Sequence, residues 1–79
     1  MPLRYTAEAD KHHVPHKSTW RVVLTARSEP TVTNWGEPGL LYVGIDDRGV
    51  ELEVITVNRH GDEIAVHSMP TSYRHDTRN

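Results

Sequence analysis

The chain has 79 residues, with nine Lys and Arg against eleven Asp and Glu, six His and no Cys. This length supports one small domain over residues 1–79, and we take residues 1–10 and 75–79 as candidates for disorder. The composition excludes disulfide-stabilised and Cys-ligated zinc classes, a membrane span and a strongly basic nucleic-acid coat, and no signal peptide opens the chain. We therefore expect a cytoplasmic protein without a membrane partner.

The first half of the chain predicts one helix over residues 18–27. Ser18 or Thr19 could cap it, since their hydroxyls can accept a hydrogen bond from a backbone N–H of the first turn. Helical spacing is seen at Trp20, Val23, Leu24 and Arg27. An earlier helical turn is expected over residues 7–11, a stop at residues 28–30, a short strand over 31–35 and a turn over 36–39.

The second half predicts three strands, over residues 40–45, 50–57 and 63–69. The links 46–49 and 58–61 both begin with Asp or Asn and end with Gly. That pattern favours a type I turn followed by a left-handed Gly, which makes a three-residue hairpin loop with a bulge. The fold expected is α+β: a three- to four-stranded antiparallel β-meander with one N-terminal helix packed on one face.

This loop type predicts the register of both hairpins. In the first hairpin, Tyr42 should face Val54 and Val43 should face Glu53. In the second, Glu53 should face His67, Val54 should face Val66, Thr56 should face Ile64 and Ile55 should face Ala65. The face expected beneath the helix then carries Tyr42, Val50, Leu52, Val54, Ile64 and Val66.

The opposite face should be half apolar and half charged. Its expected members are Leu41, Val43, Ile45, Glu51, Glu53, Ile55, Val57, Ala65, His67 and Met69. An exposed apolar surface on so small a protein indicates a partner, a homodimer or a ligand. The interface residues expected are Leu41, Val43, Ile55 and Met69.

Glu53 and His67 are the main candidate pair for chemistry. A carboxylate beside an imidazole can orient it and support its protonated form for acid–base work. The plainer alternative is a surface ion pair across two strands, which is common in antiparallel sheets.

A second candidate group is basic and lies in a hairpin loop and the C-terminal tail. Arg48, Arg74 and Arg78, with Tyr73, could hold an RNA phosphate and stack on a base. We expect Arg48 to lie near Arg74. The alternative is a solvated loop and tail.

The histidines of His12-His13-x-x-His16 have the spacing of a helical metal site, but Pro15 interrupts it and no further carboxylate ligand is evident. We expect a polar turn there, with no metal and no cofactor. Phosphate-binding loops, nucleophile elbows and DNA-reading helices are also missing from the sequence.

The segments 44–55 and 64–70, ending near Tyr73-Arg74, resemble small actinobacterial toxin-like proteins. These carry a G-x-D-x-R-G-x-x-L-E-V strand pair followed by V-I-H-A-M-P and a basic tail, and look related to BrnT-type and RelE-like toxins of type II toxin–antitoxin modules. The segment 11–15 is similar to the K-H-G-V segment that precedes the first long helix there. The resemblance covers roughly residues 11–74.

The resemblance implies a helix packed on an antiparallel sheet, metal-free cleavage of mRNA, often on the ribosome, and inhibition by a cognate antitoxin. By residue match, His67 takes the family's histidine position, Arg48 its turn arginine and Arg74 its C-terminal basic position. His67 would then act as base or acid, Glu53 would orient it, and Arg74 and Arg48 would bind phosphate.

Two functions therefore stay open. The first is a toxin-like endoribonuclease. The second is a non-catalytic interaction module, such as a phage or mobile-element protein that binds a host protein, or a homodimer. The net charge of −2 favours the second, because RNA-cleaving toxins are usually basic. His13 also stands where the family has Gly.

Overall fold

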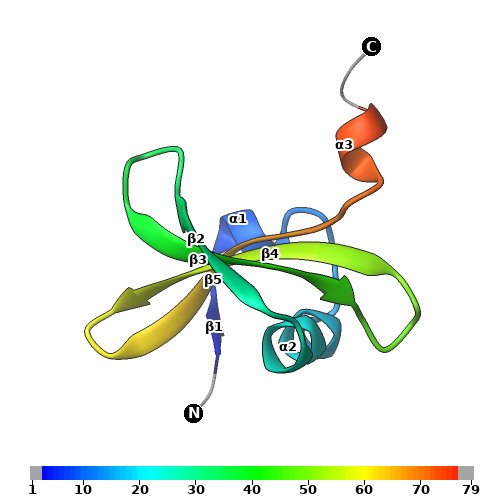
Figure 1. The fold of residues 1–79 in the computed structure, drawn as a ribbon, viewed down its shortest axis with the longest axis horizontal. Coiled ribbons are helices and arrows are strands. Elements are labelled where there is room, and N and C mark those ends of the chain that lie inside the picture. Colours follow the sequence, from blue (N-terminus) through cyan, green and yellow to red (C-terminus); the bar gives the residue numbers. More distant parts are fainter. Residues whose placement is uncertain (1–2, 77–79) are drawn as a thin grey trace.

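Five strands form one mixed sheet in the order β1-β5-β4-β3-β2, seen edge-on in Figure 1, in a computed structural model that describes residues 3–76. The strands are β1 (Arg4–Tyr5), β2 (Ser28–Val32), β3 (Pro38–Ile45), β4 (Glu51–Arg59) and β5 (Asp62–Pro70). The helices are α1 (Ala7–Asp10), α2 (His16–Thr25) and α3 (Tyr73–Asp76). The α+β class is confirmed, but the expected pure meander of three or four strands is wrong, because β1 adds a parallel pair with β5.

Helix α2 begins two residues before its predicted start, and Pro15 takes the N-cap position. Ser18 and Thr19 are therefore not caps but fully buried residues inside the helix. The Ser18 hydroxyl donates to Asp47 Oδ1 at 2.7 Å, and the Thr19 and Ser68 hydroxyls hydrogen-bond at 2.6 Å. These bonds tie the helix to the β3–β4 loop and to β5. The predicted apolar stripe was partly wrong, since Leu24 points into solvent.

The β3–β4 hairpin has the predicted loop and register. The N–H of Gly49 donates to the carbonyl of Asp46, and Gly49 has the positive φ of 81° that the bulged loop requires. Tyr42 pairs with Val54 and Val43 with Glu53, as predicted.

The β4–β5 hairpin turns differently from its prediction. His60 and Gly61 have φ of 55° and 84°, the two adjacent positive values of a two-residue type I′ turn, and Arg59 pairs with Asp62. Near the turn the register is therefore one residue from the prediction. Such a slip moves side chains to the other face.

The slip corrects the expected faces of two residues. Ala65 pairs with Thr56 and joins the core on the helix side, whereas Ile64 pairs with Val57 on the other face. The predicted pairs Val54–Val66, Thr56–Ile64, Ile55–Ala65 and Glu53–His67 are not the observed ones.

A bulge opposite the Ile55–Thr56 step then takes up one more residue of β5. Beyond it Ile55 pairs with His67 and Glu53 with Met69. The offset from the prediction is now two residues, so Glu53 and His67 still share a face, but diagonally. Val66, which we expected beneath the helix, is skipped by the pairing and lines a groove with His67 on the opposite face.

Residues 3–15, the described part of the chain before α2, run along the outer edge of β5. Thr6 caps α1, accepting a hydrogen bond from the N–H of Ala9, and its own N–H donates to the Ala65 carbonyl. Ala9 packs against Ala65 in a small core cluster. Of the residues that we took as candidates for disorder, 1–2 and 77–79 lie outside the described residues.

The opposite edge also differs from the prediction. Residues 28–30, expected as a stop, lie inside β2, and the expected strand 31–35 mostly forms the β2–β3 loop. Pro30 is tolerated because β2 is an edge strand, whose outer side has no ladder partner.

The main core lies between α2 and the sheet, as predicted. Its buried members are Val14, Val22, Tyr42, Leu52 and Val54. Figure 1 shows α2 on one side of the sheet and the β2–β3 loop on the other. Helix α1 lies beside β5, where Ala9 packs with Ala65. None of the helices within residues 3–76 has the length and apolar character needed to cross a bilayer.

Candidate functional site

The centre of the candidate site is the Glu53 carboxylate, on the face of β4 turned away from α2. Its side chain is only 6% exposed, and its Oε2 lies 2.8 Å from His67 Nε2 on β5. The register and the bulge bring these two side chains together, since both lie on one face two positions apart along the ladder. A buried carboxylate needs a charged or hydrogen-bonding partner, and His67 is one.

Arg74 supplies the second partner of this carboxylate. It stands in α3, after Pro70 has ended β5, and its Nε forms an ion pair with Glu53 Oε1. Both oxygens of Glu53 are therefore engaged, one by an imidazole and one by a guanidinium. The three residues predicted as catalytic, His67, Glu53 and Arg74, come together in the structure.

His12 is a fourth member of the cluster. It follows α1, and its ring lies edge-on to His67 at 6.3 Å and to Tyr73 at 5.6 Å between centroids. Desolvation lowers the pKa of His12, and the charges of Lys11 and His67 lower it further. An imidazole with a lowered pKa therefore faces the imidazole that Glu53 holds.

Sequence reasoning considered His12 only as a metal ligand and missed this placement. A signal was available, because Lys11 and His12 match the K-H of the segment for which the resemblance was noted. The register of the strands does not predict where His12 lies, because α1 is placed by contacts with β5, such as that of Ala9 with Ala65, that join residues far apart in sequence.

A groove of about 470 Å³ opens beside this cluster. Ile55, Val66 and Met69 line it from the sheet, and residues 32–35 of the β2–β3 hairpin line it from one side. Glu8, Lys11 and His12 line it from α1 and the turn that follows. Ile55 and Met69, predicted as interface residues, therefore belong to a groove rather than to a flat surface.

A second cavity, of about 750 Å³, lies on the same face of the sheet. Its lining residues are Leu41, Val43, Glu51, Glu53, Thr71, Ser72 and Arg74. The two cavities share Glu53, so the carboxylate stands between them. Leu41 and Val43, the other predicted interface residues, line this second cavity, and Val43 is exposed.

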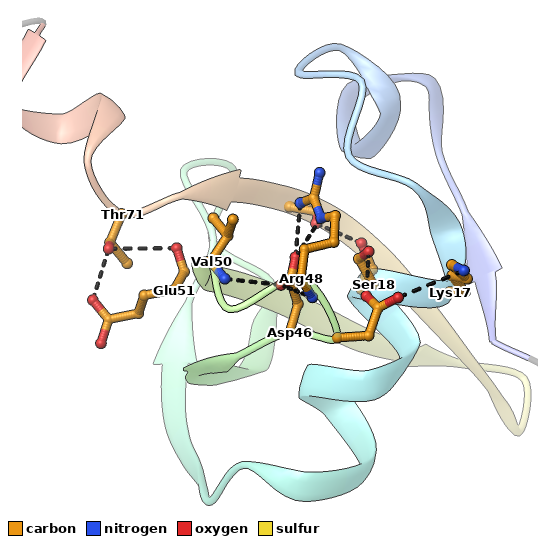
Figure 2. Close-up of polar contacts among 10 residues, drawn as sticks. Lys17, Ser18, Asp46, Arg48, Val50, Glu51 and Thr71 are labelled. Atoms are coloured by element: carbon orange, nitrogen blue, oxygen red, sulfur yellow. Dashed lines mark hydrogen bonds and ion pairs between the residues drawn. The ribbon is translucent and has the colours of Figure 1, made fainter.

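Arg48 does not join the cluster. Figure 2 shows its guanidinium folded back onto Asp46 of its own hairpin, with Nε and Nη2 2.9 and 2.7 Å from Asp46 Oδ2. Arg48 lines neither of the two cavities that share Glu53. The expected proximity of Arg48 and Arg74 therefore gives no common site, because the short-range pair with Asp46 holds Arg48 in place.

The remaining predicted RNA-binding residues divide in two. Tyr73 is exposed in α3 and contacts His12, so it lies at the margin of the cluster. Arg78 lies outside the described residues.

The histidines of the 12–16 segment point to different partners. His16 stacks on Tyr5 at 3.7 Å and hydrogen-bonds Asp10, whereas His12 faces His67. Within residues 3–76, no group of three or more His, Asp or Glu side chains is placed to hold a metal ion.

Comparisons of the chain with protein-family models, with curated proteins and with solved structures found no match.

Proposed function

We propose that this protein is a toxin-like endoribonuclease that cleaves mRNA in the cytoplasm by acid–base chemistry carried by its side chains. The observation that carries the proposal is the cluster of His12, His67, Glu53 and Arg74. The first three line one open groove, and Arg74 contacts Glu53 from the neighbouring cavity. Two imidazoles in unlike surroundings, with a guanidinium beside them, are the groups that this reaction needs.

The roles follow from the surroundings of each group. His12, with its lowered pKa, is the base that removes the proton from a ribose 2′-hydroxyl. The 2′-oxygen attacks the adjacent phosphorus, and the bond to the 5′-oxygen breaks, leaving a 2′,3′-cyclic phosphate. His67, supported by Glu53, donates a proton to the departing 5′-oxygen. Arg74 stabilises the negative charge that develops on the phosphoryl oxygens.

The first experiment is inducible expression in a bacterial host, with growth and total-RNA integrity measured together. The wild type should arrest growth and fragment RNA, and His12→Ala, His67→Ala and Arg74→Ala should each abolish both effects. In purified protein, loss of one acid–base group should slow cleavage by about 10²–10⁴-fold. Arg21→Ala, which removes an exposed charge on α2 away from the groove, is the matched control.

The pH profile of purified protein tests the role of His12. Because its pKa is lowered, the acidic limb of kcat/KM, which reports the free enzyme, should lie below the ordinary histidine value of about 6.5. His12→Gln should remove that limb. RNA that stays intact with wild-type protein that is folded and in excess would refute the endoribonuclease.

A second candidate is the interaction module, favoured by the exposed apolar side chains of Val43 and Ile45 beside the larger cavity. A cognate antitoxin, a host protein or a second copy of the chain could cover them. Growth arrest with intact RNA, together with one stoichiometric partner whose binding Val43→Asp abolishes, would favour this function.

A further inference from the structure

Trp35 is a large apolar side chain held in one orientation at the surface. It stands at the tip of the β2–β3 loop and is 57% exposed. Its Nε1–H donates to Glu37 Oε1 at 2.8 Å, so the polar edge of the indole is anchored.

Glu37 is itself fixed by a two-pronged pair with Arg59 of β4. Arg59 Nη2 lies 2.7 Å from Oε1 and Arg59 Nε lies 3.0 Å from Oε2. The hydrogen bonds from Arg59, and next that from Trp35, lower the pKa of Glu37 to about 2. The carboxylate is therefore ionised at any ordinary pH, and the anchor persists.

The loop backbone is ordered as well. The N–H of Thr33 donates to the Glu37 carbonyl, and the Thr33 hydroxyl accepts from the N–H of Glu37 at 2.9 Å. Gly36, with φ of 90°, supplies the left-handed residue of the turn. An exposed indole on a loop built in this way gives up side-chain entropy without burying its surface, which indicates a role in recognition.

Trp35 lines the same 470 Å³ groove as His12 and His67. The groove thus has an aromatic ring and aliphatic side chains in one part and the acid–base cluster in another. An occupant that suits both parts has a flat apolar face joined to a phosphodiester. A nucleobase of single-stranded RNA meets that description, because every base has a face that can stack on an aromatic side chain.

We propose that Trp35 is a stacking platform for an unpaired base beside the phosphodiester that His12 and His67 cleave. This inference rests on the proposed function and names its substrate class as single-stranded RNA. A base in a duplex is stacked on its neighbours and could not enter the groove.

The test uses the intrinsic fluorescence of Trp35 in a Trp20→Phe background, where Trp35 is the only Trp. Trp20 is half-buried against the small core cluster that contains Ala9 and Ala65, and it lines neither cavity of the site. The probe is a short single-stranded oligoribonucleotide with 2′-O-methyl groups, which lacks the attacking hydroxyl. The same sequence with one abasic position, and the same sequence as a duplex, are the comparison ligands.

We expect the single-stranded probe to quench Trp35 fluorescence, and the duplex to do so much less. An abasic position should weaken the quenching of Trp35 only when it stands at the one place in the oligomer whose base stacks on the indole. Trp35→Ala should raise Kd, followed by fluorescence anisotropy of a labelled probe, by about 5- to 150-fold, the usual range for loss of one stacked base. Trp35→Phe should recover part of this loss.

Two further variants separate stacking from general effects. Glu37→Gln weakens the pair with Arg59 and should raise Kd less than Trp35→Ala, because the ring remains but is less well held. Leu24→Ala removes an exposed apolar side chain of α2 on the other side of the sheet and should leave Kd unchanged.

The outcomes distinguish this inference from the function on which it rests. RNA cleavage without quenching, or with a Trp35→Ala Kd equal to that of the wild type, overturns the stacking site and leaves the endoribonuclease. Quenching and a Trp35-dependent Kd without any cleavage support the base site and overturn the endoribonuclease. Binding of duplex as tight as single strand overturns the stacking site.

Discussion

The Asp46–Arg48 pair of the β3–β4 hairpin allows a worked prediction of stability. The Asp46 side chain is fully buried, and its Oδ1 accepts from the N–H of Arg48 at 2.7 Å and of Val50 at 2.9 Å. Its Oδ2 accepts from the Arg48 guanidinium, and Figure 2 shows these contacts closing the loop. Asp46→Asn keeps the first oxygen and replaces the second by an NH₂ group facing the guanidinium.

The loss in the free energy of unfolding that Asp46→Asn causes can be estimated from these contacts. Each of the two hydrogen bonds removed joins charged groups, and such bonds contribute about 1.5–3 kcal/mol when shielded from water. The Arg48 side chain is 42% exposed, so solvent screening reduces the total for the pair to about 1–2 kcal/mol. Asp46→Ala also leaves the two backbone N–H groups without this acceptor, at about 1–3 kcal/mol for an unsatisfied donor, and should cost about 3–5 kcal/mol in total.

These amounts are large for a domain of this size. At about 0.05–0.15 kcal/mol per residue, the whole chain is stable by about 4–12 kcal/mol. Asp46→Asn should therefore lower Tm by about 4–16 °C, and Asp46→Ala should approach unfolding at 37 °C. Urea unfolding at pH 7 with unchanged m would measure both losses. An Asp46→Asn loss no larger than the roughly 0.5 kcal/mol of an ordinary surface substitution would refute the argument.

The same pair has a signature in pH. Burial would raise the pKa of Asp46, but hydrogen bonds from Val50 and from Arg48, with the Arg48 charge, outweigh burial and lower it. Because the folded pKa is depressed, this contribution is present above the unfolded value of about 3.9 and is lost as pH falls through the folded value. The wild-type advantage over Asp46→Asn should be constant from pH 5 to 7 and shrink below about pH 4. A constant difference down to pH 2 would contradict the depressed pKa.

Two further predictions concern backbone geometry. A Cβ at Gly44 would lie 2.9 Å from Ala26 Cβ, so Gly44→Ala should lower the free energy of unfolding in urea by about 1–3 kcal/mol. Adding Ala26→Gly should restore this loss, and a double variant as unstable as Gly44→Ala alone would place the strain elsewhere. His60, with φ of 55°, begins the type I′ turn at which Asn-Gly is preferred, so His60→Asn should raise Tm by about 2–6 °C, and a lower Tm would contradict the turn type.

Local sequence patterns predicted the structure correctly where the residues of a turn favour one backbone conformation. The loop at 46–49 ends in a Gly that must have positive φ, and the register it imposes placed Val43 opposite Glu53 correctly. The alternation of β3 and β4 then identified the face under the helix. Glu53 and His67 were found as a pair because an offset of two residues preserves the face of a strand.

The loop at 58–61 shows where local reasoning failed. It begins with Asn and ends with Gly, much as the loop at 46–49 begins with Asp and ends with Gly. Yet the chain makes a two-residue turn at His60-Gly61 and recovers the faces by a bulge. Both solutions are locally acceptable. In the observed arrangement β5 also contacts β1 and α1, for example through the hydrogen bond from the Thr6 N–H to the Ala65 carbonyl, and such contacts, far apart in sequence, are invisible to a local pattern.

The sequence by itself therefore determined the α+β class, the β3–β4 register and the residue types of the site. Only the tertiary structure decided that Arg74 returns to Glu53, that α1 brings His12 to His67, and that Arg48 is held by Asp46 instead. The physical reason is the sequence distance over which each effect acts. Strand alternation and turn geometry depend on a few neighbouring residues, whereas the site joins side chains on or next to α1, β4, β5 and α3, whose contacts depend on the packing of the whole chain.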